Sequence, residues 1–554
     1  MINNDRVDGI MRRFSRMETE RAVFDQHWRE IAERILPRGD YFRVNRQPGD
    51  KHTEKVFDAT AALALDRFAA AMESTLTPRT QRWHRLTTSE PDLANDASVR
   101  AYLDAVTDVL FSVRYSPRAN FASQCHEAYI SLGAFGTGAV FVDDMVGQGI
   151  RYRSIHLSEL YIQENHQGII DTVYRKFPLT ARQAVQKFGK DKLSKKILDS
   201  AEKSPETSYS FIHAVGPNAE QEYGKKSFKG MPWYSCYVAY DSREIVSEGG
   251  YHSMPYSVGR YVTGVKEIYG RSPAMTVLPD IKMLNEMSKT VIRAAHKIVD
   301  PPLLLQEDGA LSAFDLRPGA LNYGGVSDQG NQLVHPLQTG ARIDIGLDMM
   351  EQRRKVINDA FLVTLFQILV ETPEMTATEA MLRAQEKGAL LAPTMGRQQS
   401  EFLGPMIERE IDILSRANVL PPMPDALRER GGIVEVEYQS PLNRAQRSEE
   451  GVAILRTLQA VTPLAQIDPT VMQIFDPDAI ARELAEINGV PIRVLRSKEQ
   501  IAGMAAQASQ AAQAQALLQA APVASGVVRD LAQAQSMAGA APGQAAPQLF
   551  PSPA

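Results

Sequence analysis

The chain has 554 residues, of which 44% are hydrophobic and 23% are charged, as in folded globular proteins rather than fibrous or disordered ones. Its 61 Lys and Arg residues and 66 Asp and Glu residues give a formal net charge of −5. This balance excludes a uniformly basic protein that coats nucleic acid, so any contact with DNA has to be local. At roughly 100 to 200 residues per domain, the length allows about three to five domains or one large interleaved architecture.

Cysteine content and hydropathy exclude further classes of protein. Cys125 and Cys236 cannot form a disulfide framework, and no Cys/His cluster has the spacing of a structural zinc site. The first residues are charged and lack the apolar centre of a secretory signal peptide. The apolar stretch 361–370 is far shorter than the ~20 residues that span a bilayer. We therefore expect synthesis in a reducing cytoplasm, without membrane insertion, metal or cofactor.

The first quarter of the chain is predicted to be helical. Phe14 and Trp28 belong to a set of large apolar residues that recur every three or four positions over residues 5–36, with charged residues on the opposite face. Pro37 and Gly39 end this pattern. Further helices are predicted over residues 56–76, 92–113 and 120–132.

Short β-rich runs replace the helical pattern between residues 136 and 262. Strands are predicted over residues 138–142, 150–156, 231–240 and 244–247, and the turn residues 166–168 indicate a hairpin. A small helical insert is predicted over residues 180–202. This part of the chain is therefore expected to be mixed α+β.

The segment from residue 270 to residue 371 carries the most informative pattern. Pro279 and Asp280 are typical of a helix start, and Asp300-Pro301-Pro302 prevents continuation beyond residue 299. At 1.5 Å per residue, this helix is roughly 31 Å long. One face is apolar, and the opposite face carries a mostly basic stripe formed by Lys282, Lys289, Arg293 and Lys297.

A second long helix is predicted over residues 344–370. It follows a Gly- and Pro-rich insertion, residues 301–339, in which turns and short strands are expected. The helix carries a basic triplet formed by Arg353, Arg354 and Lys355. It is followed by a polar, proline-broken segment that cannot continue the helix, Glu371, Thr372, Pro373, Glu374 and Met375.

The last third of the chain is predicted to be mostly helical. The capping box Thr376-x-x-Glu379 opens a third long helix that runs towards Ala417 with interruptions at Gly388 and Pro393. A strand over residues 433–438 and helices over residues 443–488 are predicted to follow. Residues 501–554 are rich in Ala and Gln and poor in large apolar residues, so the final part is expected to be disordered.

The sequence contains no complete catalytic motif. The glycine-rich segment GAFGTG (133–138) precedes a strand and lacks the Lys-Ser/Thr of a phosphate-binding loop. GRSPA (270–274) lacks the final Gly of a nucleophile elbow, and His126-Glu127 and Asp143-Asp144 lack neighbouring metal ligands. Acidic residues that are distant in the sequence could still converge on a metal, as in nucleases, so a metal-dependent DNA-processing enzyme stays open as an alternative.

The basic stripe on the helix after Pro279 has two interpretations. A row of Lys and Arg residues is usually a solvated face or one half of the salt bridges between neighbouring helices. A regular row of cations can also contact phosphates along a DNA duplex without reading bases, which gives weak and salt-dependent attraction. The pattern alone does not separate these interpretations.

Several stretches of the sequence are similar to one known family. The most specific are GRSPAMTVLPDIKMLNEMSKTVIRAAHKIVDPPLLL (270–305) and MTATEAMLRAQE (375–386). ERILPRGDYF (33–42), FDATAALALDRFAAAMESTLTPRTQRWHRL (57–86) and GVPIRVLRSKEQI (489–501) extend the similarity over about residues 5–502. In these stretches the chain resembles the head-to-tail connector, or portal, protein of short-tailed bacteriophages.

The resemblance implies a mainly helical α+β portal fold that assembles into a dodecameric ring around a channel. Its regions would be a wing at 1–270, stem helix one at 271–300, a clip at 301–343, stem helix two at 344–370, a tunnel loop at 371–375, a wing segment with a long kinked helix and a strand at 376–442, a crown at 443–502 and a partly disordered tail at 503–554. The tunnel-loop residues and the seven cations of the two stem helices would then be candidates to face DNA in the channel.

The same resemblance implies a function without catalysis. The ring would occupy one capsid vertex of the virion and guide double-stranded DNA, independent of sequence, during packaging and ejection. The implied partners are the large terminase subunit, a tail adaptor or nozzle protein, and the major capsid and scaffolding proteins, with assembly in the host cytoplasm. A phage nuclease and a capsid-associated scaffold without a channel are the competing hypotheses.

Overall fold

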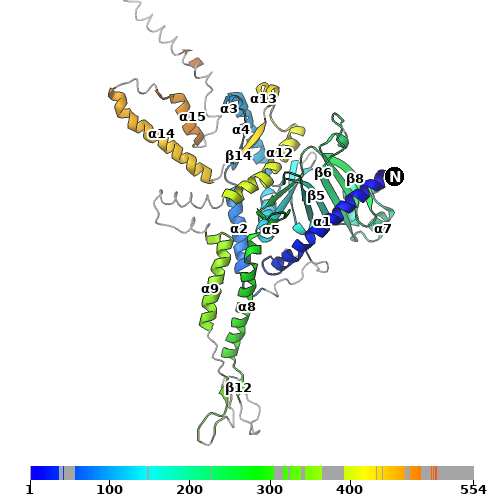
Figure 1. Ribbon diagram of the computed structural model, residues 1–554, viewed down its shortest axis with the longest axis vertical. Helices are drawn as coiled ribbons and strands as arrows, with labels where there is room; N and C mark the ends of the chain where they lie inside the picture. The colour runs from blue at the N-terminus through cyan, green and yellow to red at the C-terminus, as the bar shows by residue number, and fades with distance from the viewer. Residues whose placement is uncertain are drawn as a thin grey trace, which may run out of the picture. The chain divides into compact units, whose positions relative to one another are not determined.

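The computed structural model describes residues 2–36, 42, 56–145, 149–225, 227–304, 343–364, 392–431, 433–438, 441–467 and 474–487, with short stretches between 315 and 337 and between 501 and 507 (Figure 1). The chain divides into two compact units, residues 1–452 and 453–554. The first unit combines helices with antiparallel sheets. This combination confirms the α+β class predicted from the sequence.

Five helices make up the first part of the chain: α1 (Ile2–Ala32), α2 (Thr60–Leu76), α3 (Pro91–Asn95), α4 (Ala97–Arg114) and α5 (Phe121–Phe135). They confirm the predicted helical quarter. The apolar stripe of α1 is buried in two places, with Phe14 in one hydrophobic cluster and Trp28 in the main core. The periodicity of large apolar residues therefore identified the buried face of α1 correctly.

An antiparallel five-stranded sheet has the strand order β4-β5-β6-β7-β8. Its strands are β4 (Leu160–Glu164), β5 (Ile170–Thr180), β6 (Ser208–Pro217), β7 (Trp233–Ala239) and β8 (Glu244–Tyr251). Side chains alternate between the two faces of a strand. Ile212 of β6 therefore packs with the start of α1, whereas Phe211 packs with α6 (Ala181–Phe188) and α7 (Lys195–Lys203), so helices cover both faces (Figure 1).

A three-stranded sheet with the order β3-β2-β9 lies in the main core. Its strands are β2 (Thr137–Met145), β3 (Gly149–Ile155) and β9 (Tyr256–Arg260). The first six residues of β2 are all buried because α5 packs against this strand. The predicted strands at 138–142 and 150–156 and the hairpin formed by β4 and β5 are confirmed, whereas β6 and β9 were not predicted.

Three two-stranded sheets complete the described strands: β1 (His84–Thr88) with β14 (Val434–Tyr438), β10 (Val262–Thr263) with β11 (Gly270–Arg271), and β12 (Leu303–Leu304) with β13 (His335–Pro336). The first joins segments that are far apart in sequence, with Leu86 opposite Val436. The third lies in the insertion after α8 and confirms that this insertion contains short strands.

The glycine-rich segment 133–138 allows close approach of backbone to backbone. Gly136 ends α5 with a φ of +81°, and a Cβ atom there would lie 2.3 Å from the carbonyl oxygen of Gly270. A Cβ atom on Gly138 would lie 2.4 Å from the carbonyl oxygen of Ala128. No residue with a side chain fits at these positions, so the glycines serve packing.

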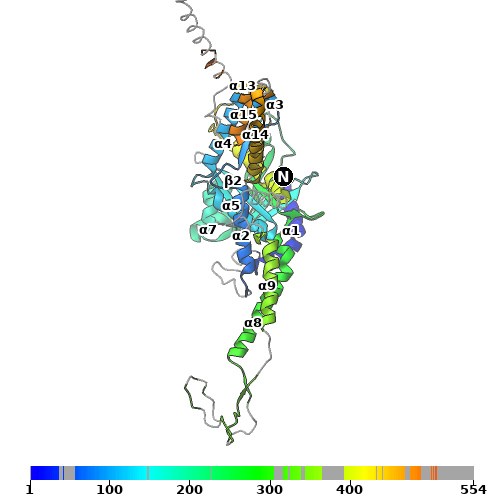
Figure 2. The ribbon, with the colours of Figure 1, turned by 90° about the vertical axis from the view of Figure 1, so that its left-hand side faces the viewer.

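Helices α8 (Pro273–Val299) and α9 (Ile343–Ala360) lie side by side (Figures 1 and 2). α8 begins before the predicted start at Pro279. The Oγ of Ser272 caps it by accepting a hydrogen bond from the backbone N–H of Met275 at 3.0 Å, and Pro273 takes the first helical position. The start signal at Ser272 therefore dominates over the proline further along.

The predicted helix over residues 344–370 is interrupted after Ala360, and residues 365–370 lie outside the described residues. α9 ends at Ala360, and Leu362 adopts a left-handed conformation with a φ of +59°. Phe361 and Val363 are both buried, although on a continuous helix they would lie about 200° apart. The turn at Leu362 lets both side chains reach the core, so tertiary packing overrides the helical pattern here.

The remaining described elements are the π-helical turn η5 (Gln398–Leu403), α12 (Gly404–Arg416), α13 (Asp425–Arg430), α14 (Pro441–Ile467) and α15 (Pro477–Ile487). The predicted helices over 443–488 correspond to α14 and α15. Residues 392–397 are helical, and the irregularity described in this helix lies at η5. The predicted interruption at Pro393 borders residues that are not described, so it stays a prediction. The predicted interruption at Gly388 and the predicted helix start at Thr376 lie outside the described residues.

Candidate functional site

The helix pair α8–α9 carries all seven cations that were predicted to contact DNA. Two contacts define how the helices lie. Nη1 of Arg353 donates to Oδ1 of Asp280 at 2.7 Å, and a Cβ atom on Gly346 would lie 3.0 Å from Cγ2 of Val291. The helices are therefore antiparallel, and the last residue of α8 that is buried is Ser288. The final three turns of α8 extend beyond the core.

Lys282 and Arg353 are each bound to a carboxylate of the same chain. Lys282 forms an ion pair with Glu30 of α1, and this hydrogen bond lowers the pKa of the Glu30 carboxyl. Arg353 spans the gap between the two helices to reach Asp280. Both cations therefore fix α8 and α9 to the body of the molecule.

Arg354 anchors α9 to the segment before α2. Its Nε and Nη2 donate to Oδ2 of Asp58 at 3.1 and 2.8 Å. Burial opposes the charge of Asp58, but hydrogen bonds from Thr60 and Arg354 keep the pKa of this carboxyl below its ordinary value. The same contact raises the pKa of Arg354. This pair is an intramolecular salt bridge of the kind that the sequence left open.

The other four cations have a different environment. Lys289 lies 3.8 Å from Glu286 on the same helix and places its ammonium group 5.5 Å from the ring centroid of Phe57. Arg293, Lys297 and Lys355 are exposed and form no ion pair with any residue that the structure describes. The seven predicted cations therefore form three groups. Three are bound to acids of other elements, Lys289 is half-buried and paired with an acid of its own helix, and Arg293, Lys297 and Lys355 are exposed and available to an external partner.

The tunnel-loop residues Glu371, Thr372, Pro373, Glu374 and Met375 lie outside the described residues. Part of the insertion after α8, the end of the predicted crown and most of the Ala/Gln-rich tail lie outside them as well. Their assignments stay predictions.

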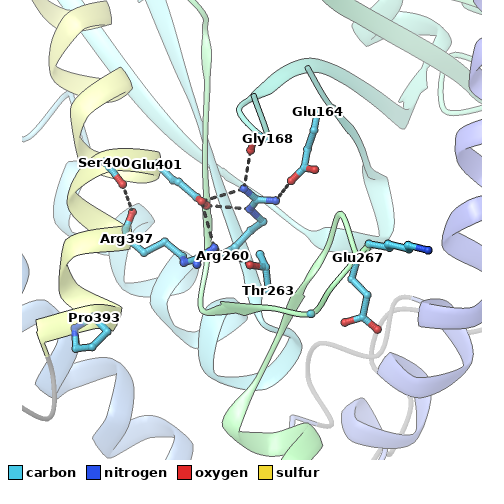
Figure 3. Close-up of a pocket in the computed structure, with 11 residues that line it drawn as sticks. Glu164, Gly168, Arg260, Thr263, Glu267, Pro393, Arg397, Ser400 and Glu401 are labelled. Carbon is cyan, nitrogen blue, oxygen red and sulfur yellow. Dashed lines mark hydrogen bonds and ion pairs between the residues drawn. The ribbon is translucent and has the colours of Figure 1, made fainter. Parts of the chain in front are cut away.

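A cluster of charged residues lines a polar pocket of about 530 Å³ beside β9 (Figure 3). Arg260 lies at its base and donates from Nε and Nη2 to the two carboxylate oxygens of Glu401, each at 2.9 Å. It also donates to Glu164 and to the carbonyl oxygens of Gly168 and Ile268. All five N–H groups of this guanidinium are thus used.

The chemistry of this pocket is structural. Burial opposes the charge of Arg260, but the hydrogen bonds that it donates to Glu401 and Glu164 raise its pKa. The pocket wall also includes Arg397, whose Nη1 donates to Oγ1 of Thr263 at 2.8 Å. Because every donor of Arg260 is occupied, it cannot bind a further anion. Instead it joins the carboxyl end of β9 to β4 and η5.

A second buried charge network was missed by the sequence analysis. Arg114 of α4 donates to both carboxylate oxygens of Glu410 in α12, at 3.3 and 2.5 Å, and both side chains are at most 1% exposed. The hydroxyl of Tyr152 donates to Glu410 at 2.6 Å, and Nη1 of Arg114 contacts Nε2 of His84 at 2.9 Å. No sequence pattern pairs residues this far apart, so only the fold identifies this network.

The acidic and histidine residues singled out from the sequence do not assemble into a metal site. His126 contacts Glu73 at 2.9 Å, and burial raises the pKa of Asp143. Among the residues that the structure describes, no group of three or more His, Cys, Asp or Glu side chains is placed to hold a metal ion. The helices described are also too short or too polar to cross a membrane.

Comparison with known proteins places the chain in one family. The family model described as bacteriophage head to tail connecting protein matches residues 7–495. The chain is 31% identical over 518 residues to the probable portal protein of Bordetella phage BPP-1, which covers 92% of this chain and 93% of the relative. It is 30% identical over 529 residues to the portal protein of Salmonella phage epsilon15, with coverage of 92% and 93%.

Two solved structures align over 76% of this chain. One is a chain of the virion of a native gene transfer agent particle, with 11% identity, 92% of that chain covered and a TM-score of 0.37. The other is a chain from the neck of an empty gene transfer agent particle, with 12% identity, 94% covered and a TM-score of 0.37.

Proposed function

The chain belongs to the bacteriophage head to tail connecting protein family, and from this membership we propose that it forms a ring at one capsid vertex, through which double-stranded DNA passes during packaging and ejection. Two relatives that match nearly the whole chain are portal proteins. The membership confirms the predicted phage portal protein, a structural component and not an enzyme. It gives no support to the alternative of a metal-dependent nuclease.

The proposed regions follow the order of the elements. Residues 1–270 form the wing, α8 and α9 lie within the stem segments at 271–300 and 344–370, and residues 301–343 form the clip between them. Residues 371–375 form the tunnel loop, residues 376–442 return to the wing, and residues 443–502 form the crown, followed by the tail at 503–554. Support comes from the two antiparallel helices α8 and α9, which flank an insertion containing a short hairpin.

The observation that carries the proposal is how α8 is held. Residues of its first half are buried, whereas its last three turns are half-buried or exposed and lie beside α9 (Figure 1). A pair of helices that extends from a mixed α+β body can repeat around an axis and enclose an opening. Head-to-tail contacts that close on themselves produce such a ring. We take twelve copies as the working number, as the family resemblance implies.

The proposed contact with DNA is electrostatic and independent of sequence. Lys282, Arg353 and Arg354 already bind carboxylates within the chain, so they contribute less to the potential of a channel. Arg293, Lys297 and Lys355 are the exposed cations left for DNA phosphates or for a neighbouring subunit, and half-buried Lys289 could exchange its contact with Glu286 for one of these. Cations that contact only phosphates give a weak and salt-dependent attraction, which lets a duplex slide.

The proposed partners follow the function of a vertex ring. The wing and crown would contact the major capsid and scaffolding proteins inside the head. The clip would dock the large terminase subunit during packaging and the tail adaptor or nozzle protein afterwards, with assembly in the host cytoplasm.

Negative-stain electron microscopy of the purified full-length chain tests this proposal. We expect rings with a central hole, together with no nuclease or ATPase activity in the same preparation. A stable monomer under assembly conditions would contradict the ring. Metal-dependent DNA cleavage that is lost on substitution of a single acid would contradict a purely structural role.

A further inference from the structure

The parts of α8 and α9 that project from the core carry opposite charge. After Glu286, the ionisable residues of α8 are Lys289, Arg293, His296 and Lys297. The acids of α9 are Asp344, Asp348, Glu351 and Asp359. Two of the three cations of α9, Arg353 and Arg354, are bound to Asp280 and Asp58. Lys355 is therefore the one cation of α9 that is not bound to a carboxylate of the described residues.

The helical repeat places these opposite charges on the outer sides of the helix pair. α8 faces α9 through Val291, and α9 faces α8 through Gly346. At about 100° per residue, Lys289 and Arg293 lie roughly 160° to 200° around α8 from Val291. Asp348 and Glu351 lie roughly 140° to 200° around α9 from Gly346 by the same count. By the same count, Glu286 lies about 220° around α8 from Val291 and Lys355 about 180° around α9 from Gly346, so each flank also carries one charge of the other sign. The flank of α8 is thus mostly basic, and the opposite flank of α9 is mostly acidic.

The two charged flanks also occur at the same height. The helices are antiparallel and meet at Val291 and Gly346. Lys289 precedes Val291 by two residues, and Asp348 follows Gly346 by two residues, so they lie level with each other on opposite flanks. Rotation about an axis parallel to the helices keeps this height, and each copy then presents Lys289 level with Asp348 of its neighbour.

Both flanks include exposed charged and apolar side chains, and Lys289 is the half-buried member of the set, 3.8 Å from Glu286 on its own helix. Arg293 and Asp348 have no partner among the described residues, and the side chain of Glu351 is 76% exposed. Ile292 on α8 and Met349 on α9 are 44% and 45% exposed beside these charges. Subunit interfaces combine exposed apolar side chains with complementary charge. The two flanks have both properties.

We propose that the basic flank of α8, Lys289 and Arg293, binds the acidic flank of α9, Asp348 and Glu351, in the next copy of this chain. This inference rests on the proposed ring and specifies one of its contacts. A second copy is the occupant because a single chain carries both complementary flanks at one height. DNA would be attracted by one flank and repelled by the other. The contact is head-to-tail, so it repeats at every interface of a closed ring.

The proposed contact narrows the set of cations that can face DNA. If Lys289 and Arg293 bind the neighbour, Lys297 and Lys355 are the described cations of the stem helices that stay available to the channel. Because the contact is made of exposed ion pairs, it weakens as salt rises.

Cross-linking between separate chains tests the contact directly. The two native cysteines are both buried, so a short bismaleimide reports on introduced thiols. One chain carries Lys289→Cys and the other Asp348→Cys, and the two are mixed before assembly. We expect covalent dimers that contain one chain of each kind. Thr276→Cys is a matched control on α8, because Thr276 is exposed but about 20 Å further along the helix from position 289.

Charge exchange provides a second test that does not depend on cross-linking. The double variant Lys289→Glu, Arg293→Glu should form rings that dissociate at a salt concentration at least twofold lower than the wild type. The double variant Asp348→Lys, Glu351→Lys should show the same decrease. All four changes together should restore wild-type salt resistance. Circular dichroism of each variant verifies that the subunit is folded.

The outcomes separate this inference from the proposed function. If the wild-type chain forms no ring, the proposed function fails. If wild-type rings form but the Lys289→Cys and Asp348→Cys chains cross-link no better than the Thr276→Cys control, the inference fails and the ring stands. Variants with charge changes whose rings keep wild-type salt resistance would overturn the inference in the same way.

Discussion

Arg114 and Glu410 form a buried ion pair that links parts of the chain separated by almost 300 positions. His84 and Tyr152 complete their hydrogen bonds, and the guanidinium of Arg114 lies 4.6 Å from the ring centroid of Trp83. Burial disfavours the charge of Arg114, but the contact with Glu410 raises its pKa. Arg114 therefore stays charged in the core, and it would be costly to leave without its partner.

Glu410→Gln is expected to reduce the free energy of unfolding by about 3 to 5 kcal/mol, because it leaves the charge of Arg114 buried without compensation. Urea unfolding monitored by tryptophan fluorescence measures the change. Asp425→Asn, which removes an exposed ion pair with Arg428, is the control and should cost at most about 1 kcal/mol. Equal effects of the two substitutions would show that the buried pair has no special role.

Buried His84 makes the stability of the folded chain depend on pH. Burial, followed by the charge of Arg114, holds the pKa of His84 well below its ordinary value, so the folded chain keeps it neutral. The unfolded chain binds a proton below a pKa of about 6.5. The stability contributed by neutral His84 is therefore complete above about pH 6.5 and is lost as the pH falls below it. Buried His213, whose pKa is also lowered by burial, acts in the same direction.

The urea concentration at the unfolding midpoint of the wild-type chain should therefore decrease as the pH is lowered from about 7 to about 5. His84→Gln keeps a hydrogen-bond acceptor for Arg114 but cannot titrate. The free energy of unfolding of this variant should decrease less steeply as the pH is lowered, by up to ~1.4 kcal/mol less per pH unit. A wild-type slope in this variant would assign the pH dependence to other groups.

At the scale of elements, α8 and α9 pack closely where Gly346 meets Val291. A Cβ atom on Gly346 would lie 3.0 Å from Cγ2 of Val291. Glycine normally weakens a helix interior by about 1 kcal/mol relative to Ala. Close packing of the two helices is the physical reason for glycine at this position.

Gly346→Leu is expected to push the two helices apart and to reduce the stability of their pairing by about 1 to 3 kcal/mol through overpacking. The Gly346→Leu, Val291→Ala double variant should recover part of this loss, because it makes room for the new side chain. Hydrogen exchange of α8 amides measures the pairing. Absence of recovery in the double variant would indicate that the helices do not meet at this point.

The sequence predicted elements whose cause is local. The apolar stripe of α1, the hairpin of β4 and β5 and the two long helices α8 and α9 all follow from periodicity, turn residues or capping residues near one another in the chain. The pairing of β1 with β14, the Arg114–Glu410 ion pair and the cluster around Arg260 depend on contacts between distant segments. The end of α9 at Ala360 was missed because burial of Phe361 and Val363, and not helix propensity, decides it.

The candidate DNA-contact residues were predicted in part. The periodicity of α8 identified a basic stripe, and the structure confirms that Arg293 and Lys297 are exposed. The periodicity could not indicate that Lys282 binds an acid of α1, Arg353 an acid of α8 and Arg354 an acid of the segment before α2. Those acids are far away in sequence or on another helix.

At the scale of the whole molecule, we predict that the exposed cations Lys297 and Lys355 affect genome retention. Lys297→Gln with Lys355→Gln should leave rings intact, and particles should retain less DNA, with a weaker dependence on salt than the wild type. Nuclease-protected DNA per particle, measured over a range of salt concentrations, tests this. Lys195→Gln with Lys196→Gln, exposed on α7, is the matched control. Equal retention in both variants would remove Lys297 and Lys355 from the channel.

The burial of both cysteines affects how the protein behaves in oxidising surroundings. Burial raises the pKa of Cys236 to about 12 and that of Cys125 well above its ordinary value, so neither forms the reactive thiolate at neutral pH. If the copies assemble in a reducing host cytoplasm, as proposed above, release from a lysed bacterium moves them into aerated surroundings. Because both native thiols are buried, this change does not join adjoining copies through oxidised cysteine pairs.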